Sequence, residues 1–590
     1  MPSYLTPRCL RCTVTALLCI FIVHSQPVFC LNQDILFVQI PKTSLESGFI
    51  GVPGGRYVDG CRIMRLNRDG ELQNLTEGFA SACDPAVDFD GNTIYFTGKR
   101  HPGDNWLLFK MNADGSEKEM IPTGIAHSVS PLRVGSLFHL NDEHPAPRLV
   151  FVGADDGWLE TIEHDSSALY SCWMDGSGVQ RITHNTLADF DPTVLPNGRV
   201  VYSSVQAVGN KLPNWKLMAV NIDGADAMLY FGQDEPFFRM LQPAASPDGR
   251  VYFIEDGRLS FVEQWRPLHT YKNLASGWFL YPCPIDDESI VISKKEGDKD
   301  IYALVRLSAQ SGAVLETVLQ DSEYHCVDAQ VLAPNERVDG RSSVVDVRKE
   351  SGVLYCLNVY ESQHGLVRDL SPGGIKAVRV IEGRYGNHSP GGKTLGEALV
   401  EEDGSFYLKV PADTPLSLQL LDESGEALRT QCGAMWVRPG ERRGCIGCHE
   451  DPELTPPNRL AQAVVKPAFD FTSTAPKPWL DFVSDIAPML ASTCVQCHDS
   501  THRLDFSCDS TNNREVKAIY DKLTHAESLS LDPTSSTVGL LYIQAGSILL
   551  SPIVREMRDK PHSLDADVIQ TFIDWINQGA PYSIQTGEQQ

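Results

Sequence analysis

A short β phrase recurs four times in the first half of the chain and limits what this region can fold into. Each copy is a short apolar-rich run that leads into Asp-Gly, at Asp69-Gly70, Asp114-Gly115, Asp175-Gly176 and Asp223-Gly224. Asp-Gly between alternating apolar residues is a strong hairpin signal, because glycine adopts a positive φ angle without steric cost. The sequence therefore predicts a series of β-hairpins.

A second phrase also recurs: a residue that precedes a proline, followed by a run of β-forming residues. It appears at Asp84-Pro85, Asp191-Pro192, Gln242-Pro243 and Tyr281-Pro282. The phrases repeat at roughly 45 to 60 residues, which is the length of a four-stranded propeller blade and too long for a solenoid coil. With weaker units near 131–152 and 328–345, we predict a β-propeller of about six blades over residues 31–345, whose phrases resemble those of TolB-like propellers.

The following stretch, residues 346–465, predicts a small β-sandwich-like domain. Residues 395–412 alternate like a hairpin about Asp403-Gly404, and residues 414–421 form another β run before a turn. Residues 466–590 are expected to be mainly α-helical. The predicted fold class is therefore multidomain and mainly β, with a helical C-terminal domain.

Two copies of Cys-x-x-Cys-His stand in the last third of the chain. They comprise Cys445, Cys448 and His449, and Cys494, Cys497 and His498. At this spacing two thiols can add to the vinyl groups of a haem while the histidine ligates the iron. We therefore expect two covalently bound c-type haems, with iron ligands at both histidines. Zinc and a dithiol redox pair are the alternatives, but the motifs are too far apart for a zinc ribbon and lack a βαβ setting.

The C-terminal region resembles a small cytochrome c domain. Apolar residues at helical spacing lead into the second motif, and a final helix is predicted between Asp565 as N-cap and Gly579 as stop. Its apolar face comprises Val568, Phe572, Trp575 and Ile576. The sixth iron ligand is expected on the loop before this helix. We assign it to His562, with Met557, His502 and His525 as the alternatives.

The run from Leu395-Gly396 through Arg438-Pro439-Gly440-Glu441 to the first motif resembles the middle domain of the hydrazine synthase alpha subunit family. That family also shares the order of propeller, β domain with one haem and cytochrome domain. The resemblance implies a catalytic first haem with an open iron, an axial tyrosine four residues after the motif histidine, and a complex of several subunits. Glu453 occupies the tyrosine position here, so His449 is expected to keep the ordinary proximal role.

The far side of the first haem is left open by the residues around the motif. The segment 451–457 contains three prolines, which prevent a helix, and it offers no methionine or histidine. Met435, His364 or His388 would have to fold back to supply a sixth ligand. An open iron binds small molecules, whereas a six-coordinate iron mainly passes electrons.

Residues 1–30 are expected to be an export signal. Arg8 and Arg11 precede an apolar run at 14–23, which is shorter than the ~20 residues of a spanning helix. An uncleaved anchor is the alternative, and no later stretch is apolar enough to cross a bilayer. We therefore expect a periplasmic or otherwise exported protein, in which some of the remaining cysteines form disulfides.

The charge balance narrows the class of partner. The chain has 50 Lys and Arg against 76 Asp and Glu, a formal net charge of -26, which disfavours nucleic acid and favours a basic redox partner. We expect an exported dihaem cytochrome that transfers electrons, with the first haem as the candidate reaction site. There are two alternatives. One is a non-catalytic propeller binding module whose haems only conduct electrons, and the other is hydrazine-synthase-like nitrogen chemistry. No catalytic residue is assigned, and any enzyme activity would be that of a haem-dependent oxidoreductase.

Overall fold

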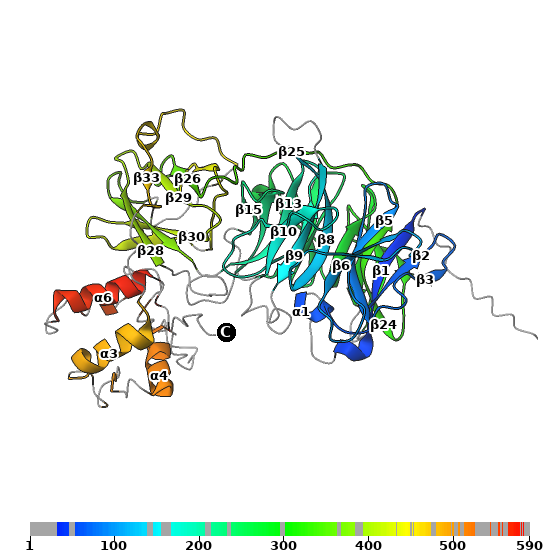
Figure 1. Ribbon diagram of the computed structural model, residues 1–590, viewed down its shortest axis with the longest axis horizontal. Helices are drawn as coiled ribbons and strands as arrows, with labels where there is room; N and C mark the ends of the chain where they lie inside the picture. Colours follow the sequence, from blue (N-terminus) through cyan, green and yellow to red (C-terminus); the bar gives the residue numbers. More distant parts are fainter. Residues whose placement is uncertain are drawn as a thin grey trace, which may run out of the picture.

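The computed structural model divides into a propeller, a sandwich and a helical unit (Figure 1). It describes residues 32–45, 53–138, 146–154, 167–206, 214–232, 238–295, 301–362, 367, 369–383, 393–431, 433–448, 451, 453–473, 480–496, 498, 500, 505–507, 512–524, 543, 551, 553–554, 557, 564–578, 580 and 582.

Six antiparallel sheets of the described chain form a ring, as predicted for residues 31–345. The first five sheets are β4 Ser81–Val87, β5 Thr93–Lys99, β6 Leu107–Asn112 and β7 Glu119–Ile121; β8 His127–Phe138, β9 Ala146–Ala154, β10 Ser167–Trp173 and β11 Gln180–Arg181; β12 Asp189–Val194, β13 Arg199–Gln206, β14 Asn214–Asn221 and β15 Met228–Phe231; β16 Met240–Ala245, β17 Arg250–Glu255, β18 Arg258–Glu263 and β19 Lys272–Ala275; and β20 Trp278–Pro284, β21 Ser289–Lys295, β22 Tyr302–Ser308 and β23 Val314–Leu319. The sixth joins β24 Tyr324–Leu332 to β1 Asp34–Pro41, β2 Arg62–Leu66 and β3 Leu72–Asn74. Because β24 pairs with β1, the end of the propeller closes onto its beginning.

The two repeated phrases occupy fixed places in these sheets. The four Asp-Gly turns connect the outer strand pairs β2–β3, β6–β7, β10–β11 and β14–β15. The residues before proline lie in the innermost strands, where the pairing register shifts and the backbone φ is positive. The six equivalent positions are Asp84, Ser130, Asp191, Gln242, Tyr281 and Asp328, and all line one cavity of about 440 Å³ on the propeller axis.

Arg56 fills the centre of this ring. It ends the short helix α1 (Pro53–Arg56), and its guanidinium donates to Asp191 Oδ1 at 2.7 Å and to Ser130 Oγ at 2.8 Å. Its Nε lies 3.2 Å from Asp84 Oδ1. These side chains are almost fully buried, so each carboxylate depends on the arginine for charge compensation.

The sandwich consists of two four-stranded sheets that enclose a common apolar core. One sheet is β32 Arg442–Cys445, β26 Ser351–Cys356, β29 Phe406–Pro411 and β33 Phe469–Asp470; the other is β28 Lys393–Leu399, β27 Ala377–Glu382, β30 Leu416–Leu421 and β31 Ala427–Thr430. A further short strand, β25 Arg341–Ser342, pairs with β8 at the edge of the propeller.

The hairpin predicted about Asp403-Gly404 is wrong. The turn exists, since Gly404 N donates to Glu401 O at 2.9 Å and Gly404 has φ +84°, but β28 and β29 belong to different sheets. A turn signal depends only on neighbouring residues, whereas the pairing of a strand depends on where its apolar face can be buried. Both strands do so against the shared core, so the chain crosses from one sheet to the other.

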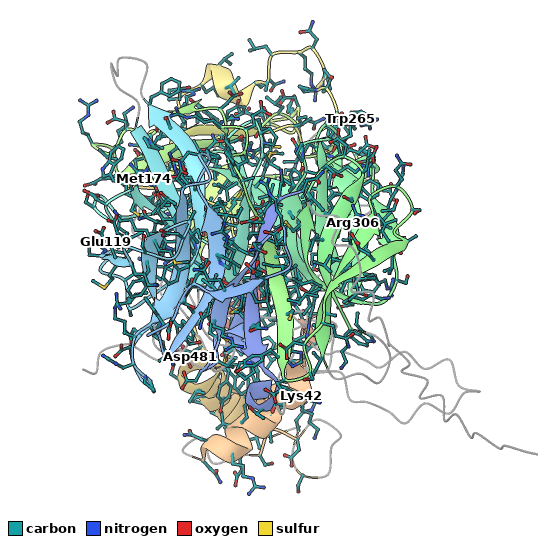
Figure 2. All side chains as sticks on the ribbon, turned by 90° about the vertical axis from the view of Figure 1, so that its right-hand side faces the viewer. Lys42, Glu119, Met174, Trp265, Arg306 and Asp481 are labelled. Carbon is teal, nitrogen blue, oxygen red and sulfur yellow. The ribbon has the colours of Figure 1, made fainter. Side chains whose placement is uncertain are left out.

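The described C-terminal residues are helical. The segment before the second motif runs through η4 Phe482–Ile486, α3 Ala487–Met489 and η5 Leu490–Cys494, and is followed by α4 Asn513–Thr524 and α6 Ala566–Asn577. The short helices η1 Lys42–Leu45, η2 Pro267–His269 and η3 Ala463–Val465 lie elsewhere in the chain. Figure 2 shows Asp481, at the start of η4, at the opposite end of the molecule from Trp265. No described helix is long and apolar enough to cross a membrane.

The predicted final helix is confirmed as α6. Phe572, Trp575 and Ile576 are buried in the helical core, whereas Val568 is only half-buried. Asp565 holds the N-cap position, but its side chain makes no capping hydrogen bond. The helix packs by its apolar face, which supplies more stability than a cap does.

Candidate functional site

The first Cys-x-x-Cys-His motif begins where β32 ends. This strand runs parallel to β26 with Cys445 opposite Cys356. Beyond the strands, Leu357 N donates to Cys445 O at 3.0 Å and Cys448 N donates to Glu361 O at 3.1 Å. The backbone of the motif is therefore held on the 357–361 segment by hydrogen bonds.

Two glycines make this close approach possible. A Cβ atom on Gly447 would lie 2.8 Å from the carbonyl carbon of Glu361 and closer still to its oxygen. A Cβ atom on Gly444 would collide with the ring of Tyr355. A side chain at position 447 therefore requires the backbone to move, and one at position 444 requires the Tyr355 ring to move.

Cys445 and Cys448 open into a cavity of about 550 Å³ between the sandwich and the propeller. The sandwich contributes Cys356, Phe406, Leu418, Leu420, Arg429 and Met435 among others, and the propeller contributes Gln206, Lys216, Met218, Asn221 and Met228 from β13, β14 and β15. Its volume lies in the range of small-molecule and cofactor pockets. Both motif thiols pack against the apolar core that contains Met435, so the pocket has an apolar floor.

The cavity is basic although the chain is strongly acidic. Lys216, Arg429, Arg442 and Arg443 line it, against Asp226 and Glu441. Glu441 is already satisfied, because it accepts from Arg438 N at 2.7 Å and from Asp226 N at 2.8 Å. Burial raises the pKa of the Glu441 carboxyl, while those hydrogen bonds act in the opposite direction. The arrangement is suited to an anionic group.

Specific contacts fix the sandwich to the propeller beside this cavity. Trp436 is buried in the propeller core and donates from Nε1 to Gly224 O at 3.2 Å. Arg438 Nη1 donates to Asp413 Oδ1 at 2.6 Å and lies 3.0 Å from His184 Nε2. Burial lowers the pKa of His184 to about 2, with Arg438 as the next cause, so this histidine is neutral at physiological pH. The two walls of the cavity therefore form one packed unit.

The segment after the motif contacts the propeller instead of the cavity. Glu453 accepts from Leu268 N at 2.9 Å and lies 3.2 Å from Arg266 Nε. Asp451 lies 2.6 Å from His269 Nε2. Glu453 does not line the cavity, so the position at which the resemblance places an axial tyrosine is here an interdomain ion pair.

The second motif begins at the end of η5. Cys494 is buried in the helical core, where Met557 is also buried. His498 N donates to Cys494 O at 3.0 Å, and the His498 ring lies 5.3 Å from that of Phe506. The structure therefore places Met557, the alternative sixth ligand, in the same core as a motif cysteine.

Several predicted residues lie outside the described part of the chain. They are the signal at 1–30, His364, His388, His449, Cys497, His502, His525 and His562. Of the cysteines predicted to form disulfides, Cys61, Cys83, Cys172, Cys283 and Cys326 are buried and unpaired. These five thiols pack as small apolar side chains.

Sequence reasoning missed the residues that face the first motif across the cavity. Lys216 and Arg429 are separated from it in the chain and belong to no motif. Cys356 sits opposite Cys445 only because β26 and β32 pair in parallel. No local sequence signal identifies such positions, because the pairing of distant strands creates them.

Comparison with known proteins shows what the region of this site resembles. Residues 373–450 match the model of the hydrazine synthase alpha subunit middle domain. Hydrazine synthase subunit alpha of Kuenenia stuttgartiensis is 25% identical over 537 aligned residues, which cover 71% of this chain and 66% of that protein. The chain thus spans slightly less than two thirds of this curated relative's length.

Similarity to a solved structure supports the fold. Kuenenia stuttgartiensis hydrazine synthase matches with a TM-score of 0.77 and 20% identity, covering 93% of this chain and 94% of that one. TolB from Acinetobacter baumannii also matches, with a TM-score of 0.36 and 12% identity, covering 51% and 66% of the two chains. The segment 373–450, which ends at the first Cys-x-x-Cys-His motif, is therefore similar to the hydrazine synthase alpha subunit middle domain, and it lies within a fold that is similar to the synthase over nearly the whole chain.

Proposed function

We propose that the chain is an exported dihaem c-type cytochrome that transfers electrons and whose first haem lies in the cavity between sandwich and propeller. The observation that carries the proposal is the position of Cys445 and Cys448, which both open into one basic cavity with an apolar floor. A haem likewise has an apolar ring and two carboxylates, so its ring would meet the apolar floor and its carboxylates the basic residues. The two thiols and the lining of the cavity therefore fit a haem.

The residues of the first site would have different roles in holding the haem. Cys445 and Cys448 would form the thioether links, and His449 would ligate the iron. When bound, a haem supplies an iron that exchanges single electrons and, if one axial position is open, takes a small ligand. Phe406, Leu418 and Leu420 would give the ring of the haem an apolar surface to pack against.

The second site is proposed as a relay. Cys494, Cys497 and His498 would hold the second haem, with His562 as the sixth iron ligand. Two histidine ligands generally give a lower potential than histidine with methionine, so this choice affects the potential difference between the two haems. A basic redox partner would dock on the acidic surface of the chain, and other subunits are proposed by analogy with the relative, which is named as one subunit of an enzyme.

A pyridine haemochrome assay combined with intact mass tests this function. Protein matured in a periplasm should carry two haems and a mass increase of two haem groups. If the first iron has an open axial position, carbon monoxide should then shift the Soret band of one of the two reduced haems. A colourless protein with the mass of the bare polypeptide would refute the proposal.

A second candidate is hydrazine-synthase-like nitrogen chemistry, favoured by the similarity to that enzyme over most of the chain. The engagement of Glu453 by Arg266 and Leu268 weighs against it, since the implied axial tyrosine is missing. Hydrazine formation from reduced nitrogen compounds, assayed with the purified protein and proteins encoded beside it, separates the two candidates.

A further inference from the structure

Arg429 has a buried nitrogen atom without an acceptor, and its side chain lines the cavity. Arg429 lies on β31 and is half-buried, and its Nε has no acceptor among the described residues. A buried donor is costly unless it is hydrogen-bonded. A partner that is not part of the described chain is therefore expected.

The other basic residues of the cavity are already engaged. The Arg442 guanidinium stacks 5.5 Å from the centroid of the Tyr407 ring, and Arg443 Nη1 donates to Trp436 O at 3.0 Å. Lys216 also has an interaction within the chain. Of the four, Arg429 is the residue with a buried donor that has no acceptor among the described residues.

The cavity as a whole carries more positive than negative side chains. Four basic residues face two acidic ones, and one of the acids, Glu441, is held by two backbone N–H groups. Two anionic groups would restore neutrality. A guanidinium binds a carboxylate through parallel hydrogen bonds, which also fixes the orientation of the bound group.

We infer that Arg429 is the anchor for a carboxylate of the cofactor in this cavity, a propionate of the first haem. This inference rests on the proposed function. It gives Arg429 a positioning role: β31 holds the carboxylate end of the cofactor while Cys445 and Cys448 hold the vinyl end. The same charge favours the reduced, less positive iron and so raises its reduction potential.

The test compares Arg429→Gln with Arg429→Lys in the full-length, haem-loaded protein. The Gln variant should shift the reduction equilibrium of the first haem about tenfold toward the ferric state, which is about 59 mV for a one-electron couple. The Lys variant keeps the charge and should retain most of the potential. Arg348→Gln is the matched control, because Arg348 lies on the sandwich surface with its side chain 86% exposed.

A double Cys445→Ala, Cys448→Ala variant assigns the potentials, since it should keep only the second haem. A wild-type protein with two haems whose first potential is unchanged by Arg429→Gln would overturn the inference alone. A wild-type protein without haem at the first motif would overturn the proposed function as well. A potential that depends on added carboxylate in the wild type, but not in the Gln variant, would assign Arg429 to an external anion and overturn the propionate assignment.

Resonance Raman spectra guard against a Gln variant that fails to fold. The propionate-bending bands of the first haem should differ between the wild type and Arg429→Lys, because the bidentate contact is lost. Identical bands would overturn the inference.

Discussion

Gly447→Ala tests how the first motif is held. The added Cβ would meet the carbonyl group of Glu361, within 2.8 Å of its carbon, so the motif has to move away from the 357–361 segment. That movement breaks the hydrogen bond from Cys448 N to Glu361 O. Overpacking a tight site costs about 1–3 kcal/mol and the lost hydrogen bond about 1 kcal/mol, so we expect a local destabilisation of about 2–4 kcal/mol.

Hydrogen exchange read by mass spectrometry on peptides that span β26 and β32 measures this cost. A destabilisation of 2–4 kcal/mol corresponds to exchange that is roughly 30-fold to 700-fold faster. The second motif supplies the control, because Gln496 holds the equivalent position and is exposed. Gln496→Ala should change the stability by less than about 0.5 kcal/mol.

Cofactor attachment gives a second measure. A displaced Cys448 thiol should lower the fraction of molecules whose intact mass includes a haem at the first motif, while Gln496→Ala leaves attachment unchanged. If Gly447→Ala exchanged and matured like the wild type, the contact with Glu361 would not position the motif, and the account of the cavity wall would be refuted.

Three further substitutions test the propeller and the second site. Arg56→Met should destabilise the propeller by about 3–5 kcal/mol in urea unfolding, because Asp84 and Asp191 remain buried without a cation; replacing both carboxylates by amides as well should recover part of the loss. Burial raises the pKa of Asp189 to about 6, so the folded state binds this proton more tightly than the unfolded chain does. The protonated carboxyl therefore adds to the free energy of unfolding below about pH 4, and this contribution is lost as the pH rises through 6. Asp189→Asn should remove this loss, which amounts to about 3 kcal/mol, and an unchanged dependence of stability on pH would contradict the argument. His562→Ala should convert the second haem to high spin in the absorption spectrum, and a low-spin spectrum would show that another residue, such as Met557, is the ligand.

The propeller could be read from sequence because its signals are local and repeated. Each Asp-Gly turn joins strands that are neighbours both in the chain and in the sheet. The pairing of β24 with β1 has no such local signal, because it joins the two ends of the propeller. The Asp403-Gly404 turn shows the limit of this logic: the same local signal joined strands of different sheets.

The candidate site could be predicted only at its Cys-x-x-Cys-His motif. The spacing of Cys445 and Cys448 indicates what they can bind, because that chemistry is local to one turn of chain. The opposite wall depends on how the propeller packs on the sandwich through Trp436 and Arg438, and no sequence signal identifies their partners on the propeller. Arg429 lies near the first motif in space because β30 and β31 border the same cavity.

This division explains why the middle domain and the propeller act as one unit. The sandwich alone would carry the thiols, the three arginines and the apolar floor, but β13, β14 and β15 supply Lys216 and the remaining wall. Without that wall, water would screen the charge of Arg429 and reach any iron held by the motif. The burial of Trp436 in the propeller core therefore bears on the proposed chemistry, since it fixes the propeller wall against the sandwich beside the cavity. On this reasoning the propeller is part of the proposed redox site rather than a separate binding domain.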